Sequence, residues 1–398
     1  MKNLIKRPLY LNELIENKDV DLIKIITGIR RCGKSSLMEL FCQYLLETGI
    51  DESRIIHMNL ESLKYNELSD YLSFYNYVSD KIQNTGKTYL LFDELQVVSG
   101  WEKAIESFRV DYDVDIYITG SNAYLLSTEF ATLLSGRYVE IKVFPLSFKE
   151  FIKFSKIQNP QKIYTTEEYF EQYLKFGGLP AIHNFSQNKT SIYQYLTDIY
   201  NSVLLKDVIS RNNIRDIELL ERVILFIFDN IGNTFSAKKI SDFLKNQGRK
   251  LSTETVYNYL KALENAYIIS KVQRYDIKGK SILETQEKFY LLDLGLKHSQ
   301  LGYRANDIAG YLENIIYLEL LRRKYNVNIG KLKTKEIDFI AQKEDKKLYI
   351  QATYLLASEN TIEREFSPLK SIKDNYSKLV LSMDNLPESN VEGIKRKK

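Results

Sequence analysis

Hydrophobic positions are arranged differently in the first third of the chain than in the rest of it. Up to residue 146, short and nearly continuous apolar runs alternate with stretches of helical periodicity. Such runs, rich in β-branched residues, are typical of strands that are buried on both faces. They lie at residues 22–28, 54–60, 88–94, 115–121 and 138–144. Because helical segments separate them, we predict a parallel sheet with helical crossovers, in an α/β domain over residues 1–146.

Three further units are predicted after this domain. Residues 147–230 are mostly helical and are expected to form a linker or lid region, in which FGGLP at 176–180 indicates a turn or hinge. Residues 231–285 contain a helix, a glycine-containing turn, a Ser/Thr-capped helix and two strands, the order of a winged helix-turn-helix. Residues 286–398 combine strands with two helices and are expected to form a small α/β domain.

Composition restricts the class of protein. Of the 398 residues, 44% are apolar and 27% are charged, as in soluble globular proteins. No apolar run approaches the roughly 18 residues that a membrane helix requires. The two cysteines, Cys32 and Cys42, form no disulfide framework and fit a reducing compartment. We therefore expect a cytoplasmic protein that does not associate with membranes.

A phosphate-binding loop is the strongest motif of the chain. The run GIRRCGKSS begins at Gly28, matches GxxxxGK[ST] in full, and lies between a predicted strand and a predicted helix. In that position the backbone N–H groups and the helix N-terminus bind phosphate. Lys34 is expected to reach the β- and γ-phosphates, and the Ser35 hydroxyl to bind Mg²⁺. ATP and Mg²⁺ are therefore the predicted cofactors. The predicted nucleotide-binding residues are Gly28, Ile29, Arg30, Arg31, Cys32, Gly33, Lys34, Ser35 and Ser36.

Polar residues at the ends of later strands supply candidates for catalysis. Asp93 is expected to hold Mg²⁺ through water, and Glu94 to orient or deprotonate the attacking water. Ser121 and Asn122 follow the next strand, and either can contact the γ-phosphate or the water, or instead cap a helix. Arg137 is a candidate for stabilising phosphate charge, in its own chain or in a neighbouring subunit, although a surface arginine is the alternative. Arg30 and Arg31 can likewise be interpreted as residues that only flank the nucleotide.

Several segments together resemble a known group of proteins. They are GIRRCGKSSLM, FDELQVVSGWEKAI, ITGSNAYLLS, LSGRYVEIKVFPLSFKEF, GGLP and LLKDVISRNNIRD. This combination resembles the prokaryotic AAA-superfamily ATPases that carry an uncharacterised C-terminal nuclease-like domain, and the similarity runs over nearly the whole chain. The resemblance implies an AAA-type P-loop core, a winged helix-turn-helix and a restriction-endonuclease-like (PD-(D/E)xK-like) domain, in that order.

The nuclease template that the resemblance implies is half missing. Such domains gather an acid from the first helix, an aspartate and an E-x-K around one or two divalent metals. Glu313 and Asp338 match the first two positions, but Gln351 replaces the second strand acid and Thr353 replaces the lysine. An amide brings no charge to a metal and threonine supplies no cation. We predict a vestigial nuclease site in which cleavage is lost or reduced.

Basic residues are concentrated in the predicted winged helix. Residues 236–281 contain ten Lys or Arg and four acids, a net charge of +6, whereas the whole chain carries +4. A basic face of this kind favours contact with the phosphates of duplex DNA. Winged helices that bind other proteins are the alternative.

The leading hypothesis is an ATP-hydrolysing switch that acts on DNA or on a protein partner. The alternative is a non-enzymatic module in which nucleotide only gates DNA or protein binding. A third hypothesis, an ATP-coupled nuclease, needs the missing acid and lysine from elsewhere in the chain. The sequence leaves the partner and the oligomeric state open.

Overall fold

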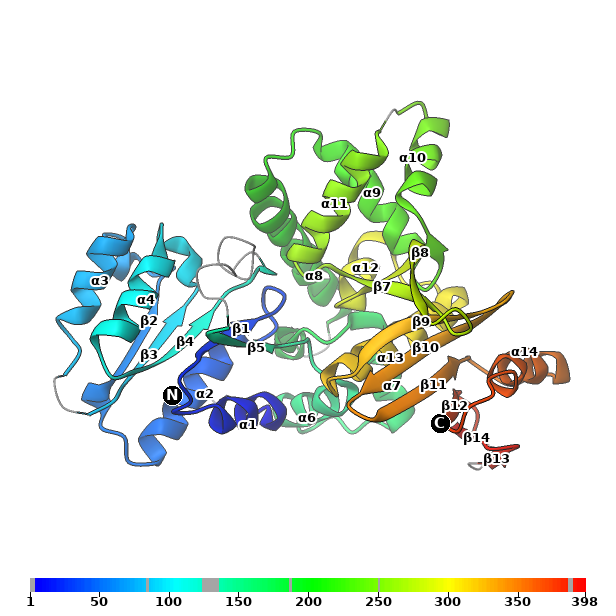
Figure 1. Cartoon of the computed structure of the whole chain (residues 1–398), viewed down its shortest axis with the longest axis horizontal. Helices are drawn as coiled ribbons and strands as arrows, with labels where there is room; N and C mark the ends of the chain where they lie inside the picture. The colour runs from blue at the N-terminus through cyan, green and yellow to red at the C-terminus, as the bar shows by residue number, and fades with distance from the viewer. Residues whose placement is uncertain (1–3, 84–85, 124–135, 186–187, 250, 386–388) are drawn as a thin grey trace.

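The computed structural model describes residues 4–83, 86–123, 136–185, 188–249, 251–385 and 389–398. Figure 1 shows an N-terminal α/β body, a group of helices beside it and a second, twisted sheet that carries the C-terminal part of the chain. Within the described residues, no helix combines the length and the apolar character that crossing a bilayer requires.

The N-terminal sheet has five strands, all parallel, in the order β2-β3-β4-β1-β5. Its strands are β1 (Ile23–Thr27), β2 (Ile55–Asn59), β3 (Thr88–Asp93), β4 (Val114–Thr119) and β5 (Tyr138–Lys142). Its helices include α1 (Pro8–Glu16), α2 (Lys34–Glu47), α3 (Tyr71–Ser79) and α4 (Trp101–Asp111). The predicted α/β class with a parallel sheet is therefore confirmed.

Apolar side chains on both faces of this sheet explain why its strands read as continuous hydrophobic runs. Successive residues of a strand point to opposite faces. Ile25 accordingly belongs to the cluster that contains residues of α3 and α4, whereas Ile26 belongs to the cluster that contains residues of α1 and α2. Every residue of β1 and of β3 is buried. The sheet is thus covered on both sides, and its ligand-binding potential lies at the carboxyl ends of the strands.

Helices follow the parallel sheet. They are α6 (Phe148–Gln158), α7 (Thr166–Phe176), the short η5 (Pro180–Phe185), α8 (Lys189–Val203), the π-helical η6 (Leu204–Ser210) and α9 (Ile217–Asp229). Both α6 and α7 begin with a capping box, in which a Ser or Thr hydroxyl and a Glu carboxylate bind the first backbone N–H groups. These local signals account for the helical pattern that the sequence displays.

The FGGLP turn is fixed by a buried carboxylate from a distant part of the chain. The N–H of Gly178 donates to Asp293 at 2.7 Å. Gly177 has φ +72°, and a Cβ placed there would meet Asp293 Oδ1 at 2.1 Å. Burial raises the pKa of Asp293 to about 7. The turn is therefore hydrogen-bonded to the C-terminal part of the chain. Glycine is required at position 177 because the backbone has a positive φ and because a side chain would collide with Asp293.

The predicted winged-helix segment merges with the C-terminal sheet. It consists of β6 (Thr234–Phe235), α10 (Ala237–Asn246), α11 (Thr253–Asn265), β7 (Ile269–Asp276) and β8 (Ser281–Leu291). The strand β7 pairs with β8 and, on its other edge, with β9. The predicted boundary at residue 285 falls inside β8, so the hairpin interpreted as a wing is an internal part of a larger sheet.

Nine strands make up this second sheet, in the order β13-β14-β12-β11-β10-β9-β7-β8-β6. Its remaining strands are β9 (Asn326–Leu332), β10 (Lys335–Lys343), β11 (Lys346–Ala352), β12 (Ser377–Leu381), β13 (Ser389–Val391) and β14 (Ile394–Lys397). The accompanying helices are α12 (Leu294–Leu301), α13 (Ile308–Arg322) and α14 (Glu359–Lys370). The helix α13 contacts β9 and β10, and α14 contacts β10 and β11. Both helices therefore pack against the central strands of this sheet.

Candidate functional site

The loop between β1 and α2 has the backbone that phosphate binding requires. Gly28 and Gly33 have φ angles of +141° and +102°, which L side chains rarely adopt. A Cβ on Gly28 would also meet the carbonyl oxygen of Val143 at 2.1 Å. The Lys34 ammonium is buried and donates to the carbonyl oxygens of Gly28 at 2.9 Å and Ile29 at 3.2 Å. Lys34 thus lies across the loop, where a phosphate would meet it.

Asp93 and Glu94 stand at the carboxyl end of β3, held by residues that end neighbouring strands. Asp93 accepts a hydrogen bond from the hydroxyl of Thr119, at the end of β4, and one from Asn59 Nδ2 at 3.0 Å, at the end of β2. The Glu94 N–H donates to Thr119 Oγ1 at 3.0 Å. Glu94 adopts φ +56°, an uncommon conformation for a non-glycine residue. Thr119 and Asn59 were not singled out by the sequence, although both end strands beside β3.

The two polar residues after β4 have different surroundings. The Ser121 hydroxyl is buried and has no hydrogen-bond partner among the described residues. Asn122 instead donates to the backbone oxygen of Asp207, in η6, at 3.2 Å. Ser121 therefore keeps a free hydroxyl near the strand ends, whereas Asn122 connects the sheet to the helical region.

Arg137 lies at the opposite end of the sheet from the phosphate-binding loop. Its carbonyl oxygen accepts from the N–H of Ile23, at the start of β1, whereas Thr27 at the end of β1 pairs with Lys142. At roughly 3.3 Å per residue this separates Arg137 from the loop by roughly 16 Å. Its guanidinium pairs with Glu106 at 2.7 Å. A role of Arg137 at the site of its own chain, one of the predicted alternatives, is therefore excluded by the register of β5, which the motif did not reveal. A role in a neighbouring subunit and a surface arginine stay as predictions.

A cavity of about 710 Å³ opens at the carboxyl ends of the strands. This size lies within the range of small-molecule and cofactor sites. Its lining includes the apolar residues Leu4, Ile5, Leu40 and Phe154. It also includes the charged and polar residues Arg30, Arg31, Lys34, Ser35, Asn59, Glu61 and Glu94. The cavity thus offers both apolar contacts and groups that bind phosphate.

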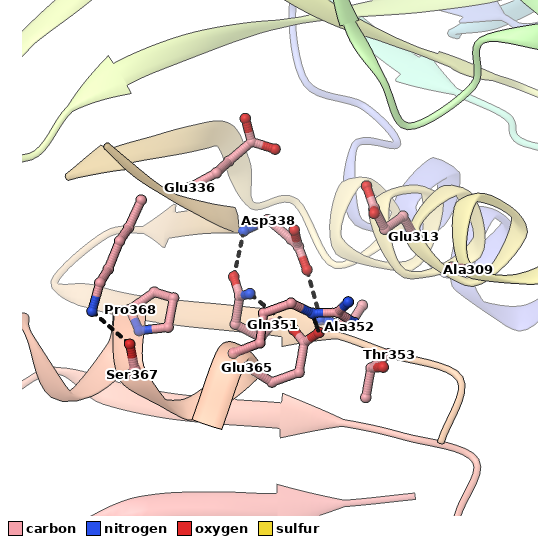
Figure 2. A pocket seen from close by; sticks show the side chains of 12 residues that line it. Ala309, Glu313, Glu336, Asp338, Gln351, Ala352, Thr353, Glu365, Ser367 and Pro368 are labelled. Carbon is pink, nitrogen blue, oxygen red and sulfur yellow. Dashed lines mark hydrogen bonds and ion pairs between the residues drawn. The ribbon is translucent and has the colours of Figure 1, made fainter. Parts of the chain in front are cut away.

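A second cavity, of about 430 Å³, lies in the C-terminal sheet and is drawn in Figure 2. Glu313 of α13, Asp338 of β10, Gln351 of β11 and the following Thr353 all line it, so the structure brings the four candidate nuclease positions together. The oxygen of the Gln351 side chain accepts from the Asp338 N–H at 2.8 Å, and its nitrogen donates to Glu365 at 3.1 Å. Both polar atoms of the Gln351 side chain are thereby hydrogen-bonded within the protein.

Lys288 of β8 supplies a positive charge to this acidic cavity. Its ammonium is only 3% exposed and donates to Glu313 at 3.0 Å and Glu336 at 2.9 Å. Burial raises the pKa of both Glu313 and Asp338, and Lys288 opposes this rise. Burial alone would lower the pKa of Lys288, but the carboxylate of Glu313, followed by that of Asp338, raises it above its ordinary value. Sequence reasoning missed Lys288, because a lysine that follows Glu287 at the start of an apolar run is an ordinary feature of a sequence.

Within the described part of the chain, no three His, Cys, Asp or Glu side chains are arranged to hold a metal ion. Two carboxylates of the acidic cavity, Glu313 and Glu336, instead pair with the buried ammonium of Lys288.

Comparison with known proteins places the chain in a family. It is 41% identical over 395 residues to an uncharacterized protein of Haemophilus influenzae, covering 99% of this chain and 97% of that protein. It is 34% identical over 403 residues to an uncharacterized protein of Methanocaldococcus jannaschii, covering 96% of this chain and 85% of that protein. The chain belongs to their family. Residues 21–152 match the model of an AAA domain, and residues 167–307 match a domain of unknown function.

A solved structure also resembles a large part of the chain, beyond the AAA domain alone. A Walker-type ATPase of Pyrococcus abyssi superposes with a TM-score of 0.56 and 16% identity, covering 75% of this chain and 96% of that chain. At this identity the likeness concerns the fold. Together with the domain match, it identifies the N-terminal part as an AAA-superfamily P-loop ATPase domain, as the sequence motifs indicated.

Proposed function

We propose that the chain binds ATP with Mg²⁺ at residues 28–36 and hydrolyses it. The observation that carries the proposal is the convergence of Lys34, Ser35, Asn59 and Glu94 on one cavity at the carboxyl edge of a parallel sheet. Asp93 lies beside them, hydrogen-bonded to Asn59. Apolar residues of the lining, such as Leu40 and Phe154, are candidates for contact with the base.

The residues present fit a magnesium ion. Ser35 offers a hydroxyl oxygen to the ion, and the carboxylate of Asp93 would hold it through water, since hard cations prefer oxygen ligands. The hydrogen bonds from Asn59 and Thr119 fix the orientation of the Asp93 carboxylate. When bound, Mg²⁺ neutralises charge on the β- and γ-phosphates. Lys34 is placed to bind the same phosphates, since its ammonium lies across the loop.

Glu94 is the proposed base for the attacking water. In hydrolysis the water oxygen forms a bond to the γ-phosphorus, the bond to the bridging oxygen breaks, and a proton leaves the water. The carboxylate of Glu94 lines the cavity, and its backbone is fixed by Thr119. The side chain of Gln96 donates to the Glu94 carboxylate, which orients it. Glu94 is thus placed to accept the proton.

Hydrolysis is proposed to drive a switch, because segments that line the cavity continue into the helical region. Pro180, the last residue of the GGLP turn, and the following Ala181 line the cavity. Asn122 binds the backbone of η6 at the other side. Both connections lead into the segment that matches the domain of unknown function. A structural change caused by loss of the γ-phosphate would therefore be transmitted to that segment through the turn at Pro180 and the hydrogen bond of Asn122.

The proposed output is association with duplex DNA through residues 236–281. Exposed lysines on α10 and the exposed Tyr257 and Asn258 on α11 support it, since exposed basic and polar side chains can contact phosphates. Such a surface binds phosphates without reading sequence.

We expect duplex DNA to bind the full chain in a salt-dependent manner and to stimulate its ATP hydrolysis. Lys238→Glu combined with Lys245→Glu should weaken binding at least about tenfold and lower the salt slope by about 2, because each neutralised phosphate releases counterions. Fluorescence anisotropy at several salt concentrations measures both quantities.

The matched control for this experiment is Lys149→Glu combined with Lys156→Glu, two exposed lysines at the same spacing on α6. Equal weakening in both double variants would contradict a site at 236–281. Absence of salt-dependent binding by the unmodified chain would assign the role to a protein partner instead.

A further inference from the structure

Arg30 of the phosphate-binding loop points into the nucleotide cavity and is held there. Its side chain is 15% exposed, and its Nε donates to Asp207 Oδ2 at 3.1 Å. Its Nη1 lies 3.6 Å from Glu61, whose side chain is 49% exposed. Burial would lower the pKa of Arg30, but the hydrogen bond to Asp207 raises it above its ordinary value, so the side chain stays charged. A fixed cation therefore stands beside Glu94 in the cavity.

Asp207 is held in place by its helix and by a hydrogen bond from Asn122 to its backbone. Its side chain is 1% exposed and belongs to η6, a π-helix, a type of turn often found at functional sites. Its backbone oxygen accepts from Asn122, and its Oδ1 lies 3.6 Å from the guanidinium of Arg211. Oδ1 has no hydrogen-bond partner among the described residues. Asp207 is consequently a rigid anchor for Arg30, supplied by another part of the chain.

We propose that Arg30 is a catalytic residue that stabilises the γ-phosphate during hydrolysis, with Asp207 as its positioning residue. This inference rests on the ATP hydrolysis proposed above. Phosphoryl transfer places charge on the oxygens of the transferred group, and a guanidinium from the same chain can stabilise it. Arg137 cannot do so in its own chain, since β5 places it at the far end of the sheet.

The two carboxylates that contact Arg30, those of Glu61 and Asp207, differ in how strongly they hold its guanidinium. The contact with Glu61 is long and exposed, so it contributes little and exchanges readily for a phosphate oxygen. The contact with Asp207 is buried and is kept, which holds the guanidinium in a defined direction. Because η6 contacts α11, the same anchor joins the phosphate site to the proposed DNA-binding helices. The arginine thus connects the AAA domain with the domain of unknown function.

The test compares hydrolysis and binding in the full chain with Mg²⁺. Arg30→Ala and Arg30→Lys should lower kcat by about 10²-fold or more. The affinity for ADP should stay within about threefold, while that for ADP with aluminium fluoride, which mimics the transition state, should fall in proportion to kcat. Guanidinium ion added to the solution should restore part of the activity of Arg30→Ala, but not of Glu94→Gln.

Asp207→Asn should lower kcat about tenfold with KM little changed, since the guanidinium of Arg30 loses its orientation but not its charge.

Arg211→Ala is the matched control, because Arg211 also pairs with Asp207 and does not line the nucleotide cavity. Its kcat should stay within about threefold of the unmodified chain, as expected for a pair that is weak and partly exposed. Thermal melting of each variant separates catalytic loss from unfolding.

Three outcomes overturn the inference. If Arg30→Ala hydrolyses ATP at the unmodified rate, or loses ADP affinity as strongly as kcat, Arg30 is not catalytic while the proposed ATPase activity stands. If the unmodified chain shows no hydrolysis that depends on Glu94, the proposed function fails and this inference fails with it.

Discussion

Replacement of Glu94 by glutamine is expected to lower ATP hydrolysis by at least about 10²-fold, because a general base contributes 10²–10⁴-fold to a rate. The amide has nearly the same shape as the carboxylate but cannot accept the proton of the attacking water. The backbone of Glu94 stays fixed by Thr119, and Lys34 still lies across the phosphate-binding loop. ATP binding should therefore be retained, and phosphate release from ATP measures the loss.

Glu102→Gln, an acid in the first turn of α4, serves as the control for this substitution and should leave hydrolysis unchanged. Equal rates in Glu94→Gln and in the unmodified chain would contradict the assignment of the base. If Glu94→Gln and the unmodified chain both bind ATP tightly but hydrolyse it slowly, the result would favour the alternative hypothesis. In that hypothesis, nucleotide binding controls the binding of DNA or protein without catalysis.

Replacement of Lys288 by methionine is expected to destabilise the chain by about 3–5 kcal/mol, the usual effect of removing one partner of a buried ion pair. The substitution leaves Glu313 without its main counter-charge inside the C-terminal sheet, and Glu336 without one of its partners. Methionine fills a similar volume, so packing is largely kept. Urea unfolding at pH 7.5 measures the change in free energy.

The pH dependence of this variant gives a second readout. Without Lys288, the folded-state pKa of Glu313 and Asp338 should rise further above the unfolded values, since the ammonium opposes the effect of burial. A raised folded-state pKa favours the folded state at low pH, and this advantage is lost as pH increases. The destabilisation should thus be smaller at pH 5.5 than at pH 7.5.

Lys271→Met is the matched control on the neighbouring strand of the same hairpin. Lys271 pairs with Glu287 at 3.1 Å but is 35% exposed, so its loss should change the free energy of unfolding by less than about 1 kcal/mol. A similarly small effect for Lys288→Met would contradict a buried ion pair that neutralises the acidic cavity.

Local sequence signals predicted the parts of the molecule whose chemistry lies within a few consecutive residues. The phosphate-binding loop needs two glycines, a lysine and a serine between a strand and a helix, and all of these are visible in one run. Continuous apolar strands separated by helices predicted the parallel sheet for the same reason. The AAA domain was therefore accessible to sequence reasoning before any strand pairing was known.

Features that depend on strand register or on distant contacts were not accessible in this way. Arg137 seemed suited to the phosphate site until the pairing of β5 with β1 placed it at the other end of the sheet. Asp207 anchors Arg30 across 177 positions of sequence. Lys288 faces the acidic cavity only because β8 joins the hairpin to the C-terminal sheet. Each of these relations is created by tertiary structure.

The central claim is that ATP binds at the loop between β1 and α2. Isothermal titration calorimetry of the full chain with Mg²⁺ and a non-hydrolysable ATP analogue tests it most directly. The account predicts one nucleotide per chain, and a loss of at least about 10²-fold in affinity for Lys34→Ala, since the buried ammonium is proposed to bind the β- and γ-phosphates. Equal affinity in the folded Lys34→Ala variant, or no binding to the unmodified chain, would contradict it.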